Sequence, residues 1–128
     1  MTSARFLLAA LLAAAVFGCG DDAPKSQPQI LSVDDFRREL VGMPLCGVAK
    51  AGEFAGKLTC TVHLADGTAI VAGSGLLARG IWDTDGKGIC RRDAVEPADR
   101  RRCVVYERLG TNRYRNSDGV EFCIGPCP

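Results

Sequence analysis

The sequence predicts a mainly β protein, with a small antiparallel meander or barrel-like sheet, one N-terminal helix and bracing disulfides. Three observations lead to this prediction. Apolar and polar residues alternate over residues 57–64, as they do in a strand whose two faces differ. Turns built on Gly or Asp-Gly recur at close spacing after that strand. Of the seven cysteines, six follow Cys19, and an even number in a short exported chain indicates a disulfide framework.

The export signal lies at the N-terminus. Arg5 precedes an apolar stretch over residues 6–17, which is too short to cross a bilayer as a helix and fits a secretory signal peptide. Gly18-Cys19 follows this stretch and resembles the lipobox of bacterial lipoproteins, whose cysteine is lipidated and becomes the first residue of the mature protein. The resemblance implies a signal peptide at 1–18 and lipidation of Cys19. Ordinary cleavage, with Cys19 as one more thiol, is the alternative.

Residues 19–31 are predicted to be a flexible tether after Cys19, because they begin polar and include two prolines. A single β-rich domain over residues 32–128 follows and opens with a helix. Ser32 can cap that helix, with Asp35 three residues later in a relaxed capping box. Gly42 ends it. The helix places its apolar residues on one stripe, namely Val33, Phe36, Leu40 and Val41.

Seven short strands are expected after the helix. The first, 57–64, carries its apolar residues on one face and Thr59, Thr61 and His63 on the other, and we expect His63 to be a solvated surface residue. Asp66-Gly67 then makes a hairpin turn. Further strands are predicted at 68–72, 76–82, 88–92, 102–109, 112–115 and 120–124. This close spacing favours a strongly bent meander or a small closed barrel.

No catalytic, cofactor or metal site is expected. His63 is the single histidine, and no serine stands in a nucleophile-elbow motif that could use it as a base. Cys123 and Cys127 have three residues between them, including a proline, which favours a structural bridge over a redox motif. Asp83-Thr84-Asp85-Gly86 lacks the flanking acids of a calcium loop and is interpreted as a tight turn.

Several motifs of the domain resemble a group of small exported proteobacterial proteins classed as domains of unknown function. The motifs are Leu40-Val41-Gly42, Asp66-Gly67-Thr68, the stretch 80–90 and Cys103-Val104-Val105-Tyr106, so the likeness spans roughly residues 33–123. The resemblance implies a compact envelope domain in which Cys90 and Cys103 pair, and it implies no chemistry. Spacing by itself leaves 15 connectivities open for the six cysteines, Cys46, Cys60, Cys90, Cys103, Cys123 and Cys127.

Charge gives one candidate binding surface. The 16 basic and 15 acidic residues nearly balance, which argues against nucleic acid as a partner. Five arginines, however, flank the loop between Cys90 and Cys103, and pairing of those cysteines would gather them near one end of the domain. Guanidinium groups suit carboxylate or phosphate. The alternative is a solvated loop paired internally with Asp93, Glu96 and Asp99. The five are Arg91, Arg92, Arg100, Arg101 and Arg102.

These observations predict a lipid-anchored bacterial envelope protein that acts as a non-enzymatic binding or structural module. The alternative is an inhibitor of a periplasmic or host hydrolase, similar to the small β-barrel lysozyme-inhibitor lipoproteins, although Ser74-Gly75 matches only part of their Ser-Gly-x-x-Tyr loop. Gly20, rather than Asp, follows Cys19, and the enterobacterial lipoprotein rule then implies the outer membrane, facing the periplasm. The expected partners are the lipid bilayer, through acylated Cys19, and anionic envelope polymers or another envelope protein.

Overall fold

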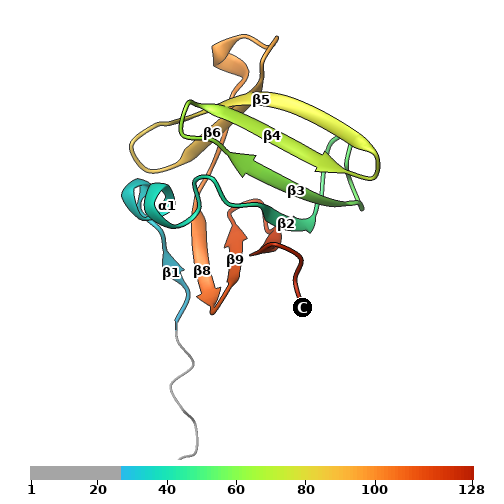
Figure 1. The fold of residues 1–128 in the computed structure, drawn as a ribbon. Helices are drawn as coiled ribbons and strands as arrows, with labels where there is room; N and C mark the ends of the chain where they lie inside the picture. The colour runs from blue at the N-terminus through green and yellow to red at the C-terminus, as the bar shows by residue number, and fades with distance from the viewer. Residues whose placement is uncertain (1–26) are drawn as a thin grey trace, which may run out of the picture.

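The computed structural model describes residues 27–128, so the predicted leader, Cys19 and most of the predicted tether lie outside the described residues. The predicted fold class is confirmed. One antiparallel sheet of ten strands, one short α-helix and three disulfides make up the described part of the chain (Figure 1). No helix in this part is long and apolar enough to span a membrane.

The elements follow the chain in a simple order. The helix α1 is Val33–Glu39, and a 3-10 helix, η1, is Ala98–Arg100. The strands are β1 Gln29–Ile30, β2 Leu45–Val48, β3 Leu58–His63, β4 Thr68–Gly73, β5 Leu76–Thr84, β6 Ile89–Asp93, β7 Arg102–Val104, β8 Tyr106–Gly110, β9 Arg113–Asn116 and β10 Glu121–Ile124.

The sheet curls so that strands from its two ends, β7 and β8, are consecutive parts of one chain segment. The pairing runs β8-β9-β10-β2-β3-β4-β5-β6-β7, with β1 added beside β8. Because Val105 alone separates β7 from β8, one bent segment pairs with β6 in its first half and with β9 in its second half. Figure 1 shows the strands curving around a common interior. This closure leaves few free strand edges, which are the sites where sheets aggregate.

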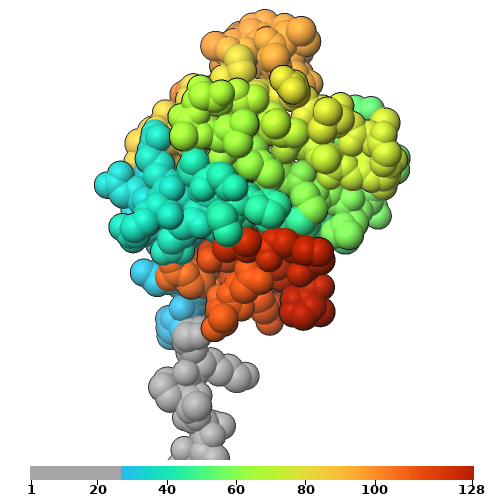
Figure 2. All heavy atoms as spheres, in the orientation of Figure 1, coloured from blue at the N-terminus to red at the C-terminus, as the bar shows by residue number. Residues whose placement is uncertain are grey.

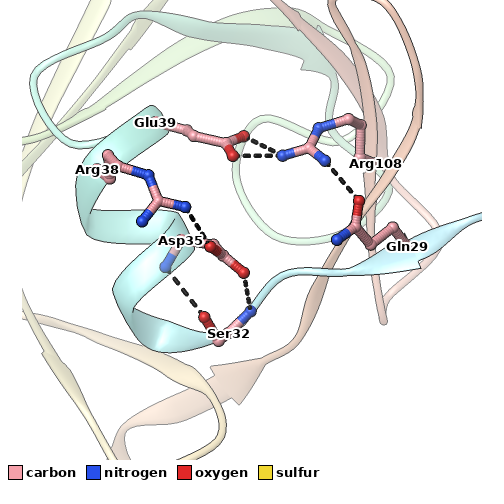
Figure 3. Close-up of polar contacts among 6 residues, drawn as sticks. All are labelled: Gln29, Ser32, Asp35, Arg38, Glu39 and Arg108. Atoms are coloured by element: carbon pink, nitrogen blue, oxygen red, sulfur yellow. Dashed lines mark hydrogen bonds and ion pairs between the residues drawn. The ribbon is translucent and has the colours of Figure 1, made fainter.

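Helix α1 is fixed by the capping that the sequence predicts. The Ser32 side chain accepts a hydrogen bond from the Asp35 backbone N–H at 3.1 Å, and the Asp35 carboxylate accepts one from the Ser32 N–H at 3.2 Å. Arg108 of β8 ties the helix to the sheet by contacting Glu39, and it also donates to the Gln29 side chain of β1 at 2.7 Å (Figure 3). These contacts hold α1 over one end of the curled sheet.

The core lies at this helix end of the interior. Phe36 is 1% exposed and packs its ring against Tyr106, His63 and Trp82, with ring centroids 4.9, 5.2 and 5.9 Å away. The backbone N–H of Gly42 donates to the His63 carbonyl at 2.7 Å, so the turn after the helix is anchored to the end of β3. A seven-residue helix is marginal alone, and burial of Phe36 against three rings stabilises it.

The orientation predicted for β3 is wrong. Thr59 and His63 are buried inside the curl, whereas Leu58, from the apolar face, is 57% exposed. The pairing gives the reason, because Cys60 on the apolar face lies opposite Cys46 of β2, and these two form a disulfide on the outer face. His63 is therefore a core residue and not the solvated surface residue expected from the sequence.

Two strands lie where the sequence predicts none. β1 falls inside the predicted tether: Gln29 and Ile30 pair with β8, and Leu31 is 3% exposed. The ordered domain therefore begins before residue 32. β2, which follows Pro44, pairs with both β3 and β10 and completes the closed order.

Candidate functional site

The interior of the curled sheet is filled at the helix end and open at the other. A cavity of about 970 Å³ occupies the open part. Its wall includes a row of inward side chains on four neighbouring strands, Leu45, Thr61, Val71 and Ala78, which lie directly opposite one another in register. A cavity of this size is at the upper end of the range for small-molecule sites.

Two loops border the opening. Residues 49–54 belong to the connection between β2 and β3, at the Leu58 end of β3, which is the end away from α1. Residues 94–96 and Arg100 come from the segment that joins β6 to β7, and Asp93 at the end of β6 borders the cavity beside them. This second segment forms a lobe that projects from the body of the domain (Figure 2). The cavity is therefore bounded by loops at one end and by the aromatic core at the other.

His63 lies where the cavity meets the core. It is 1% exposed, and its buried Nδ1 atom has no hydrogen-bond partner. Burial, together with the positive charge of Arg91, lowers the pKa of His63 to about 4. The imidazole is consequently neutral at physiological pH.

Tyr106 borders the cavity beside His63. Burial raises the pKa of Tyr106 to about 12, although the positive charge of Arg91 acts in the opposite direction. The phenol therefore stays protonated, and it is a neutral polar group in the cavity wall. Together His63 and Tyr106 give the inner end of the cavity polar groups without net charge.

Arg91 and Arg102 supply positive charge to the wall. They face each other on β6 and β7, and Arg91 also lies opposite Trp82 of β5, so its strand position faces the interior. Arg102 forms an ion pair with Asp118 at 3.4 Å. Among residues 27–128, Arg91 has no ion-pair partner. An unpaired guanidinium beside a partly apolar cavity attracts an anion.

The other three arginines of the predicted cluster differ in their surroundings. Arg100 and Arg92 line the opening, and the Arg92 guanidinium donates to the Glu96 carbonyl at 2.7 Å. Arg101 points elsewhere and pairs with Asp83 at 2.8 Å. Four of the five arginines thus share one cavity. The ion pairs of the cluster go to Asp83 and Asp118, and not to the acids expected from the sequence, Asp93, Glu96 and Asp99.

The six described cysteines form three bridges. Cys90 pairs with Cys103, as the resemblance to the exported proteins implies, and the remaining bridges are Cys46–Cys60 and Cys123–Cys127. Asp85 lies near the Cys90–Cys103 sulfurs, but these sulfurs are bonded to each other and cannot act as thiolate ligands. The Asp85 carboxylate instead accepts the Gly88 backbone N–H at 2.8 Å, which fits the predicted tight turn.

Sequence reasoning missed most of the cavity wall. The alternation over residues 57–64 places Thr59, Thr61 and His63 on the solvent face, and Leu45 lies outside the predicted strands, yet all four border the cavity. The signal in the sequence is the cysteine at position 60. Its disulfide to Cys46 of the neighbouring strand lies on the outer face, so Thr59, Thr61 and His63, on the other face of β3, point inward. Cys19, the predicted lipidation site, lies outside the described residues.

No family model, curated protein or solved structure matches the chain. The case for a functional site therefore rests on the cavity itself.

Proposed function

We propose that this protein is a lipid-anchored protein of the bacterial envelope that acts as a non-enzymatic binding module and holds a small molecule inside the curled sheet. The supporting observation is the open cavity of about 970 Å³, whose wall combines apolar side chains with a few polar and cationic ones. Binding sites for small molecules have this composition.

Other features agree with the proposed location. The leader pattern and Cys19 favour export and lipid attachment. Three disulfides in a domain of this size are typical of an oxidising compartment such as the periplasm. Acylation at Cys19 would supply the two or more chains needed for stable anchoring.

The state of His63 favours binding over catalysis. A general base works best with a pKa near the operating pH and needs a partner that orients it. His63 has a pKa of about 4, and its Nδ1 atom lacks a hydrogen-bond partner. The residue is better suited to shaping the inner end of the cavity than to moving protons.

The binding proposal is tested by asking whether the protein carries a molecule from its host. The full chain is purified from the host envelope and analysed by native mass spectrometry. We expect a discrete added mass of a small molecule. Ala78→Phe places a ring in the cavity and should abolish the added mass, whereas Ala72→Phe, on the outer face of the neighbouring strand, should retain it. No added mass in the wild type, or its retention in Ala78→Phe, would contradict the proposal.

The anchoring proposal has its own test. Cys19→Ser should move the protein from the membrane fraction to the soluble periplasmic fraction, and labelled palmitate should enter the wild type only. Wild-type protein that carries no label, or a Cys19→Ser variant that stays with the membranes, would refute lipid attachment at this residue.

A further inference from the structure

We infer that the cavity takes a small amphiphile with one anionic head group, which lies beside Arg91 while its apolar body contacts Ile89, Val104 and Phe122. This inference rests on the proposed binding function and names the chemical class of the ligand. Two features carry it: Arg91, which has no ion-pair partner among the described residues, and the order of residues along the cavity wall.

Charges of both signs surround the cavity. Six basic and four acidic residues border it, but the strand register turns Arg79 and Arg92 to the outer face of the sheet, so no large net charge faces the interior and an anion would be attracted by an individual cation. The basic ones are Lys50, Arg79, Arg91, Arg92, Arg100 and Arg102, and the acidic ones are Glu53, Asp93, Glu96 and Asp118.

Arg91 is the best-placed of these cations. Asp118 neutralises Arg102 in part, and the Glu96 carbonyl occupies a donor of Arg92. Arg91 has no such ion-pair partner among the described residues, and it is near enough to His63 and Tyr106 to act on the pKa of both. Arg91 is exposed to solvent, and charge-assisted hydrogen bonds to a carboxylate or phosphate would satisfy its guanidinium.

The order of residues along the wall favours an amphiphile over a simple ion. On β6 and β7 the inward pair Arg91–Arg102 is followed by the inward pair Ile89–Val104. Residues two positions apart in a strand are separated by about 6.6 Å, so the wall changes from cationic to apolar within one step. Phe122 continues the apolar surface on β10. A head group at Arg91 would thus have apolar surface within the length of a few methylene groups.

The test uses the full chain carrying Cys19→Ser, exported to the periplasm and freed of any lipid that copurifies with it. Binding of four probes is measured by isothermal titration calorimetry. Decanoate combines the two features, decanol lacks the charge, acetate lacks the chain and decylamine reverses the charge. All are used below their micelle concentrations. We expect decanoate to bind with one-to-one stoichiometry and at least 10-fold more tightly than each of the other three.

Two variants assign the charge to its residue. Arg91→Gln should weaken decanoate binding at least 10-fold and leave decanol binding unchanged. Arg101→Gln is the matched control, because Arg101 belongs to the same cluster but pairs with Asp83 and does not line the cavity; it should bind decanoate like the wild type. Thermal unfolding of both variants verifies that they fold.

Each unexpected binding result contradicts one part of the inference. Equal binding of decanoate and decanol, or decanoate binding that is unchanged in Arg91→Gln, overturns the anionic head group. Acetate binding as tight as that of decanoate overturns the apolar body. If none of the probes binds, the inference fails, but the binding function itself is decided separately by the native mass spectrum and Ala78→Phe.

Discussion

Acidification from pH 7 to pH 5 should destabilise the folded protein by about 2 kcal/mol through His63 alone. In the unfolded chain the imidazole has a pKa near 6.5, whereas burial lowers the pKa of His63 to about 4 in the folded protein. Between these two values the unfolded state binds a proton that the folded state excludes, so the free energy of unfolding falls as the pH falls. The loss reaches about 3 kcal/mol at pH 4, is complete about one pH unit lower and becomes negligible above pH 7.

The effect can be measured cleanly because the chain holds one histidine and one tryptophan. Denaturant unfolding at pH 7, 6 and 5, followed by Trp82 fluorescence with the disulfides intact, gives the free energy at each pH. Asp35, Asp66 and Asp85 have pKa values lowered from 3.8, so their loss of stabilising interactions falls at lower pH and does not overlap this interval.

A variant and a spectrum serve as controls. His63→Phe keeps a ring among its aromatic neighbours but removes the proton, so its stability should be nearly constant from pH 7 to pH 5. The NMR signal of the His63 ring should titrate near pH 4. A wild-type stability that changes by less than about 0.5 kcal/mol over this interval, or a ring that titrates near its ordinary pKa of 6.5, would refute the buried, uncharged assignment.

Three further predictions concern the fold and can be measured by denaturant unfolding. Gly47→Ala should destabilise the protein by about 1–3 kcal/mol, because the added Cβ would lie 2.3 Å from the Glu121 carbonyl oxygen. In the control variant, Gly110→Ala, the added Cβ meets nothing within 4 Å, and its stability should stay within about 0.5 kcal/mol of the wild type. Equal losses of stability in the two variants would contradict this prediction. Phe36→Ala should cost about 3–5 kcal/mol, and a loss below 1 kcal/mol would show that α1 is not part of the core. Replacing Cys46 and Cys60 together by Ala opens a loop of sequence separation 14 and should cost about 3 kcal/mol, and an unchanged stability would refute that bridge.

The fold class could be predicted because the turns are local. Asp66-Gly67 forces a hairpin between β3 and β4 whatever the rest of the chain does, and Ser32 with Asp35 starts the helix. β2 could not be predicted in this way. It is four residues long and contains Gly47, whose role is to admit the close approach of β10 and is visible only once the sheet has closed.

The cavity could not be predicted from the sequence for a different reason. Hydrophobic alternation identifies the face of a strand that packs into an apolar core, but the open part of this interior has a partly polar wall. Thr59, Thr61 and His63 therefore resemble a solvent face in the sequence. Similarly, Arg91 and Arg92 are neighbours with the same charge, and only the pairing of Arg91 with Trp82 shows which of them faces inward.

The two bridges that span the sheet join residues directly opposite each other, Cys46 to Cys60 on β2 and β3 and Cys90 to Cys103 on β6 and β7. A slip of one residue in either pairing would turn the two sulfurs to opposite sides of the sheet. Oxidation can then succeed only in hairpins that have already aligned correctly, so whichever oxidant forms these bridges also selects the correct strand alignment.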